Sequence, residues 1–155
     1  MNQRIRRASA LMLAIGWSAL AAQTMQESEP ETMVDDGTYQ GVPWLSGGVG
    51  KGERDYLMSQ RADDFNLKLE FAAQSGAYLG DMRVTIAKPD GQVVVEALSK
   101  GPWFMTKLPA GTYKVEVSGY EKSYATSVNV PAVGLETLVF NQWPTPAVST
   151  PGAGL

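Results

Sequence analysis

The stretch GPWFMTKLPAGTYKVEVSGY, residues 101–120, places a Pro-Ala-Gly turn between two apolar runs. Proline presets the backbone of such a turn, and glycine accepts positive φ angles at little steric cost. Leu108 and Tyr113 bracket the turn, and we expect both to point into one core. The stretch therefore predicts two strands that meet at a corner of a β-fold.

Alternation of apolar and polar residues with a period of two extends this pattern along the chain. The KPDGQ segment that begins at Lys88 is a strong turn signal. Seven strands are predicted, at residues 65–71, 82–87, 93–97, 102–108, 113–117, 124–130 and from 138 to about 143. Short strands that are separated by turns and lack intervening helices favour an all-β fold, a seven-stranded antiparallel β-sandwich with one short N-terminal helix.

The residues outside the predicted sandwich domain, 65–143, divide into three segments. Residues 22–40 are acidic and poor in apolar groups, so we expect a disordered leader. Residues 41–64 read as a glycine-rich loop followed by a short helix that begins at Glu53 and ends near Asp63 or Asp64. Residues 144–155 are rich in proline, threonine and glycine, and we expect a flexible tail.

The first 21 residues have the pattern of a signal peptide. Three arginines precede an apolar run that ends in Ala19-Leu20-Ala21. We predict cleavage after Ala21 or Ala22, a periplasmic or secreted location, and no membrane span after cleavage. The chain has no cysteine, so a lipoprotein anchor is not expected.

Charge and composition exclude several classes of function. The chain has 13 basic and 16 acidic residues; loss of three arginines with residues 1–21 leaves 13 − 3 = 10 basic residues and a net charge of −6. Such a protein is not expected to bind nucleic acid, whose phosphates would repel it. Histidine and cysteine are both absent, so we predict no catalytic residues, no metal site and no cofactor. The GGVGKGE segment from Gly47 lacks the spacing of a phosphate-binding loop.

Carboxylates and aromatic rings remain as candidate functional groups. The candidate acids are Asp63, Asp64, Asp81 and Asp90, of which Asp81 is the least explained by a turn or a helix end. The aromatic residues that either stack on a ligand or belong to the core are Trp44, Tyr78, Trp103, Tyr120, Tyr124 and Trp143. The leading candidate ligand or partner contacts among them are Trp44, Tyr78 and Trp103.

The turn motifs resemble a known family. Asp90-Gly91, followed by Leu108-Pro109-Ala110-Gly111-Thr112-Tyr113, is similar to the carboxypeptidase regulatory-like domain, a transthyretin-like (prealbumin-like) sandwich. The arrangement also resembles a group of small exported proteins of Gram-negative bacteria. The resemblance spans about residues 42–143 and implies a fold rather than an activity. A hydrolase of the same superfamily depends on histidines, which this chain lacks, so its activity is not expected.

These observations favour an exported, non-enzymatic module that binds another envelope protein or organises the envelope. A carbohydrate-binding module that uses surface aromatics is the alternative, and an enzyme ranks third. The period of two places Trp103 and Met105 on the outer face of their strand. We expect residues 43–45 and the Tyr56-Leu57-Met58 face of the helix to cover Trp103, since a bare apolar patch marks a contact site.

Overall fold

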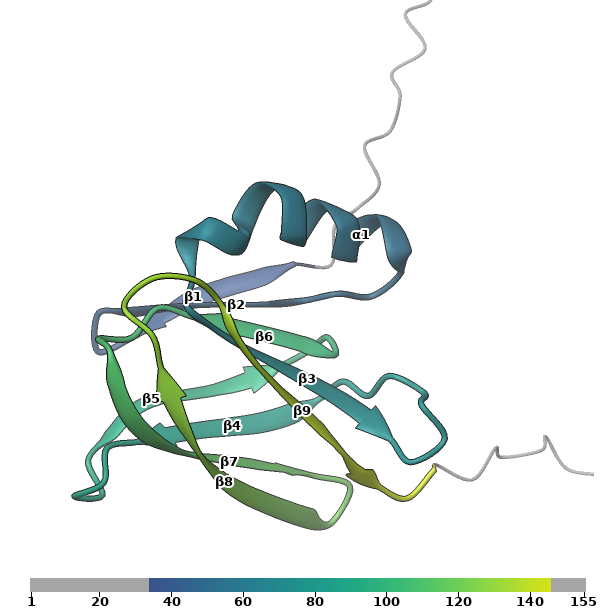
Figure 1. Cartoon of the computed structure of the whole chain (residues 1–155). Helices are drawn as coiled ribbons and strands as arrows, with labels where there is room; N and C mark the ends of the chain where they lie inside the picture. Colours follow the sequence, from purple (N-terminus) through teal and green to yellow (C-terminus); the bar gives the residue numbers. More distant parts are fainter. Residues whose placement is uncertain (1–33, 146–155) are drawn as a thin grey trace, which may run out of the picture.

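The computed structural model describes residues 34–145, and these form nine strands and one helical segment (Figure 1). The predictions for residues 1–21, for most of 22–40 and for nearly all of 144–155 lie outside the described residues. The strands are β1 (Asp35–Tyr39), β2 (Val42–Gly47), β3 (Leu67–Ala73), β4 (Met82–Ala87), β5 (Val93–Ser99), β6 (Trp103–Thr106), β7 (Gly111–Gly119), β8 (Lys122–Val130) and β9 (Glu136–Trp143).

The strands form two sheets that face each other as a sandwich (Figure 1). One sheet has the order β1-β2-β6-β3-β9 and the other the order β5-β4-β7-β8. All neighbours are antiparallel except β3 and β9, which run parallel. The seven predicted strands are confirmed as strands, but the predicted total of seven is wrong because β1 and β2 add two.

Strand β1 corrects the prediction of a disordered leader up to residue 40. Asp35–Tyr39 pairs with β2 along its whole length, through a two-residue turn at Gln40 and Gly41. Both turn residues have positive φ angles, 48° and 83°, as a tight hairpin turn requires. The prediction failed because the DDGTY segment lacks apolar alternation, and its strand conformation depends on its neighbour in the sheet.

Strand β2 corrects the prediction of a glycine-rich loop at its position. Val42–Gly47 lies between β1 and β6 and is hydrogen-bonded to both. Its residues alternate between the two faces of the sheet. Trp44 stacks on Phe104 of the inner core, with ring centres 5.8 Å apart, and Leu45 faces the opposite side.

The inner core confirms the predicted corner. Leu108 and Tyr113 both belong to the apolar cluster between the sheets, and the Tyr113 hydroxyl donates to the Pro109 carbonyl at 2.7 Å. Asn66 adds a polar brace: its Nδ2 donates to the carbonyls of Leu108 and Pro131, and its Oδ1 accepts from the Leu108 N–H. Asn66 is 1% exposed, so these bonds are made away from water.

A helical segment covers the outer face of the five-stranded sheet (Figure 1). Helix α1 (Lys51–Tyr56) continues through a π-helical turn (Leu57–Arg61) and a 3-10 turn (Ala62–Asp64), close to the predicted helix from Glu53. A second apolar cluster lies between this segment and the sheet; its members are Leu45, Leu57, Phe65, Trp103 and Met105.

The Trp103 side chain is buried within this second cluster. Trp103 is 7% exposed, so the expectation that the preceding segment covers it is confirmed. The details differ: Leu57 is the residue of the predicted helix face that joins Trp103 in the outer cluster, whereas Tyr56 and Met58 are 43% and 44% exposed and Trp44 faces the inner core. The Lys68 side chain lies over the Trp103 ring itself. The cover also makes β3 buried on both faces rather than half-buried, and Lys68 is only 7% exposed.

The two sides of the sandwich, where strands of one sheet contact strands of the other, are both bridged. On one side Ser46 of β2 and Ser99 of β5 share a hydrogen bond of 3.1 Å between their hydroxyls. On the other side the Tyr124 and Trp143 rings meet edge to face, with centres 4.9 Å apart. Closure of both sides leaves the ends and outer faces of the sandwich as the surfaces open to a ligand.

Candidate functional site

The three aromatic residues that the sequence singles out have different surroundings. Trp44 is half-buried against Phe104, and Trp103 is buried beneath the helical segment. Tyr78 is 46% exposed and lies in the connection between β3 and β4. Tyr78 is therefore the residue of the three that a ligand can reach.

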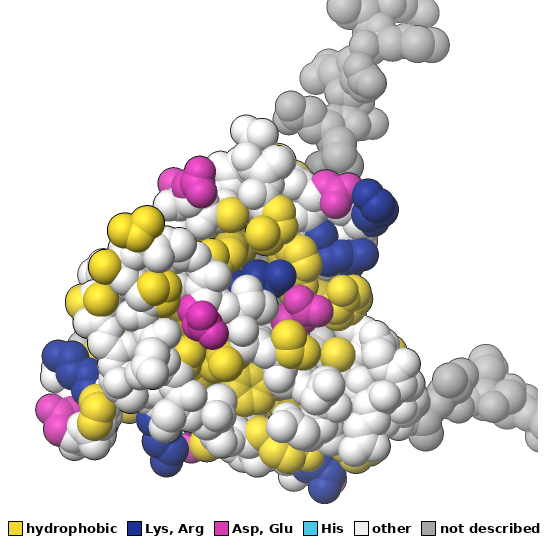
Figure 2. Space-filling view, viewed as in Figure 1, with side chains coloured by type: hydrophobic (Ala, Val, Ile, Leu, Met, Phe, Trp, Pro, Cys, Tyr) yellow, Lys and Arg dark blue, Asp and Glu magenta, His cyan; other side chains and the backbone are white. Residues whose placement is uncertain are grey.

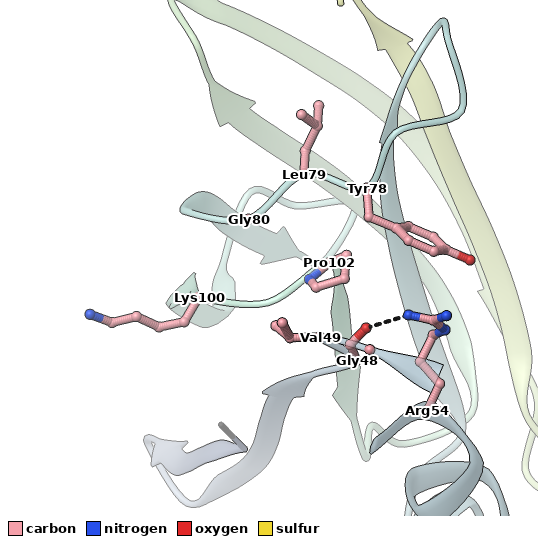
Figure 3. A pocket seen from close by; sticks show the side chains of 9 residues that line it. Gly48, Val49, Arg54, Tyr78, Leu79, Gly80, Lys100 and Pro102 are labelled. Carbon is pink, nitrogen blue, oxygen red and sulfur yellow. Dashed lines mark hydrogen bonds between the residues drawn. The ribbon is translucent and has the colours of Figure 1, made fainter. Parts of the chain in front are cut away.

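Tyr78 lines a pocket at one end of the sandwich (Figure 3). The pocket has a volume of about 250 Å³ and is formed by three loops and the start of helix α1. Its lining residues are Gly48, Val49, Gly50, Arg54, Tyr78, Leu79, Gly80, Lys100 and Pro102. None of these loops is near another in the sequence, so tertiary structure creates the pocket.

Two glycines allow the loops to approach each other closely. A Cβ atom on Gly80 would lie 2.1 Å from the Lys100 carbonyl oxygen, and one on Gly101 would lie 2.2 Å from the Gly47 carbonyl oxygen. Real Cβ atoms do not approach backbone so closely, so any larger residue would separate the loops. The floor of the pocket therefore depends on glycine at both positions.

Two consecutive residues of helix α1 hold the peptide groups of Gly48. The Gly48 N–H donates to Oε1 of Glu53 at 2.7 Å, and the Gly48 carbonyl accepts from Nη1 of Arg54 at 3.0 Å. The Arg54 guanidinium also lies 4.8 Å from the centre of the Tyr78 ring (Figure 3). Arg54 is thus fixed between a backbone carbonyl and an aromatic face, with a cation–π attraction to the ring.

The turn between β7 and β8 borders the same end of the molecule. Its two central residues, Tyr120 and Glu121, have φ angles of 51° and 61°, and the Tyr120 hydroxyl donates to the Gly80 carbonyl at 3.2 Å. Asp81, next to Gly80, has a φ of 57°. A two-residue hairpin turn requires positive φ angles at both central residues, so the angles of Tyr120 and Glu121 follow from the turn itself.

We call this end of the molecule, formed by residues 48–50, 78–81, 100–102 and 119–121, the Tyr78 pole. It presents three exposed apolar side chains, Val49, Tyr78 and Tyr120, at 48%, 46% and 51% exposure. The sequence indicated the two tyrosines as candidate aromatic contacts, with Tyr78 among the leading ones, but not Val49. The break between the predicted strands at 113–117 and 124–130 indicated a turn, but nothing in the sequence placed Val49 or Arg54 beside Tyr78.

The candidate acids have local structural roles. Asp90 accepts the Gln92 N–H at 2.9 Å within its turn, and Asp64 pairs with Arg61 at 3.1 Å. Asp81, which the sequence left least explained, occupies a backbone conformation that aspartate tolerates better than most residues. Across residues 34–145, no three acidic side chains gather in a group that could hold a metal ion.

The described surface also has a second pocket and an area where apolar and basic side chains lie together. The second pocket, about 470 Å³, lies on the outer side of the four-stranded sheet and includes Thr85, Lys88, Lys114, Glu116 and Ser127 but no aromatic residue. Figure 2 shows apolar side chains between α1 and the strands in front of it, with lysine or arginine side chains among them. Of these two pockets, the one at the Tyr78 pole combines an exposed ring with a fixed cation.

In residues 34–145 no helix has both the length and the apolar character required to span a membrane.

Comparison with known proteins assigns neither a family nor a function to the chain. A scan against models of protein families finds no match, and a search of curated proteins finds none either. The functional argument therefore depends on the geometry of the Tyr78 pole.

Proposed function

We propose that this chain is an exported, non-enzymatic β-sandwich module that binds another protein at the Tyr78 pole. The observation that carries the proposal is the half-exposed Tyr78 ring beneath the fixed Arg54 guanidinium, in an open pocket at the end of the sandwich. Tyrosine and arginine are the residue types that contribute most often to the energetic centre of protein interfaces.

The family assignment belongs to the same proposal. The corner at Leu108 and Tyr113 and the turn at Asp90-Gly91 support a transthyretin-like sandwich of the carboxypeptidase regulatory-like type. The residues at 1–21 support export to the periplasm or the medium. The net charge of −3 supports a partner other than nucleic acid.

The carbohydrate-binding alternative is less well supported. It relied on Trp44, Tyr78 and Trp103, and two of these rings are packed against Phe104 and beneath Leu57. Arg54 also covers one face of the Tyr78 ring, which leaves a single face for a sugar.

Site-specific photo-cross-linking tests the proposal. A photoreactive amino acid replaces Tyr78 in one variant and Ser127, which is exposed on the outer face of the four-stranded sheet, in a control variant. Exposed to an envelope extract of the source organism, the position-78 variant is expected to form a protein adduct of defined mass. Adding Arg54→Ala should reduce the adduct, and the position-127 control should form none. Equal adducts at both positions, or glycan-array binding abolished by Tyr78→Ala, would contradict the proposal.

A further inference from the structure

The lining of the pocket at the Tyr78 pole includes two cationic residues, Arg54 and Lys100, that have no carboxylate partner among the described residues. The ion pairs among residues 34–145 are Lys51–Asp55, Arg61–Asp64, Lys68–Glu70 and Arg83–Glu96. Neither Arg54 nor Lys100 takes part in any of them. The nearest acid along the helix, Glu53, already accepts the Gly48 N–H.

Arg54 is pre-organised to receive an anion. A guanidinium group has five N–H donors, and the described bonds use one, at the Gly48 carbonyl. That bond and the Tyr78 ring fix the position of the side chain, which lowers the entropy lost when a ligand binds. Figure 3 shows the Arg54 guanidinium at the Tyr78 side of the pocket, with the Lys100 side chain extending away from it at the opposite side.

The size of the pocket indicates the kind of anion. Its volume of about 250 Å³ is below the roughly 300–1,000 Å³ of pockets that enclose small-molecule ligands. The exposed Tyr78 ring lies beside Arg54, and exposed Val49 lines the same pocket. One acidic side chain of a peptide fits this arrangement, because its carboxylate can pair with Arg54 while its methylene groups contact the apolar rim.

We infer that the partner protein presents an acidic peptide segment, an inference that rests on the proposed function. Arg54 binds one Asp or Glu carboxylate of this segment, and Lys100 attracts further acidic residues. Carboxylate and guanidinium form two parallel, charge-assisted hydrogen bonds, so the contact selects for geometry as well as charge. The chain itself carries acidic residues at 27, 29 and 31, just before the described residues begin, and these are the competing occupant.

Selection of peptides on the full chain tests the inference. The probe is a displayed library of random heptapeptides, panned against the chain that begins at residue 22 and then measured as synthetic peptides. Selected peptides are expected to share an Asp or Glu at one position. Arg54→Gln should weaken their binding on the order of tenfold or more, as should the change of that acid to its amide. Arg83→Gln, at an exposed arginine of β4, is the matched control and should leave binding unchanged.

Because Arg54 also holds Gly48, thermal unfolding must show that Arg54→Gln is folded. Arg54→Lys, which keeps the charge without the planar guanidinium group, should bind the peptides at an intermediate level. Peptides that depend on Tyr78 but share no acid would overturn this inference and leave the proposed function standing. Absence of any Tyr78-dependent peptide would overturn both. A tenfold or greater gain in affinity on removal of residues 22–32 would make the chain's own acidic segment the occupant.

Discussion

The ammonium group of Lys68 lies 3.5 Å from the centre of the Trp103 ring and 3.3 Å from a carboxylate oxygen of Glu70. The Lys68 side chain is only 9% exposed, so its aliphatic stem and its charge both act within the cluster beneath the helical segment. The Trp103 Nε1 is buried without a hydrogen-bond partner, which makes the cation over its ring the main polar contact of that side chain.

We predict that Lys68→Ala lowers the free energy of unfolding by about 2 kcal/mol, because it removes the desolvated cation–π contact and leaves Glu70 unpaired. Chemical denaturation measures the change. Lys114→Ala, at an exposed lysine of β7, is the control and should change stability by less than about 0.5 kcal/mol. Equal effects of the two substitutions would show that Lys68 behaves as an ordinary surface lysine.

The cover over Trp103 makes a second prediction. Leu57 is fully buried in the outer cluster, so Leu57→Ala should cost about 2–5 kcal/mol in unfolding free energy and open the cover. Acrylamide quenching of fluorescence should rise relative to wild type, and the rise should vanish when Trp103 is replaced by Phe. Met58→Ala, one residue along and 44% exposed, should change neither quantity. Unchanged quenching in Leu57→Ala would mean that Leu57 does not shield Trp103.

Gly48 and Gly50 form a matched pair at the Tyr78 pole. Both have positive φ angles, 87° and 95°, but a Cβ on Gly48 would lie 2.8 Å from Cγ of Trp103, whereas one on Gly50 would meet nothing within 4 Å. Gly50→Ala should therefore cost about 1 kcal/mol, the conformational penalty alone. Gly48→Ala should cost measurably more in the same denaturation experiment, since the Trp103 ring must also shift. Equal costs would show that the ring moves freely.

Tyr113 predicts a dependence of stability on alkaline pH. Burial raises the pKa of the Tyr113 hydroxyl above its ordinary value of 10.0, and only the neutral hydroxyl can donate to the Pro109 carbonyl. As pH rises through about 10, the unfolded chain ionises first, so stability is lost with increasing pH. Tyr113→Phe should cost about 1 kcal/mol at neutral pH. The difference between the two proteins should be constant below about pH 9 and shrink as the pH rises above about 10; a difference that stays constant there would contradict the assignment.

Export makes the remaining prediction. When the gene is expressed in a Gram-negative host, N-terminal sequencing of the mature protein should begin at Ala22, or at Gln23 if cleavage follows Ala22. Replacement of both Ala19 and Ala21 by larger residues should slow processing, because signal peptidase requires small side chains at these positions. Recovery of the intact chain with Met1 from the cytoplasm would refute export.

Much of the sandwich could be predicted because its strands satisfy local rules. The alternation at 82–87 and at 113–117 leaves one apolar face that only a second sheet can bury, and the structure places Val84 and Val115 in the inner core. β1 escaped prediction for the opposite reason: the DDGTY segment has no apolar face, and its pairing with β2 supplies the hydrogen bonds that make it a strand.

Sequence by itself determined the corner at Leu108 and Tyr113 and the outward orientation of Trp103 and Met105 on their strand. It also determined that these two side chains need a cover. Each of these conclusions depends on residues that are close together along the chain. Only the tertiary structure decided that Leu57 joins Trp103 in the outer cluster and that Arg54 lies over Tyr78, which is 24 positions away in the sequence. The physical reason is that periodicity specifies which face a side chain takes within its own strand or helix. Which loops meet at the end of a sandwich depends on how strands far apart in the sequence pair: Gly80 meets Lys100 beside the paired ends of β4 and β5, and Gly101 meets Gly47 beside the paired ends of β2 and β6.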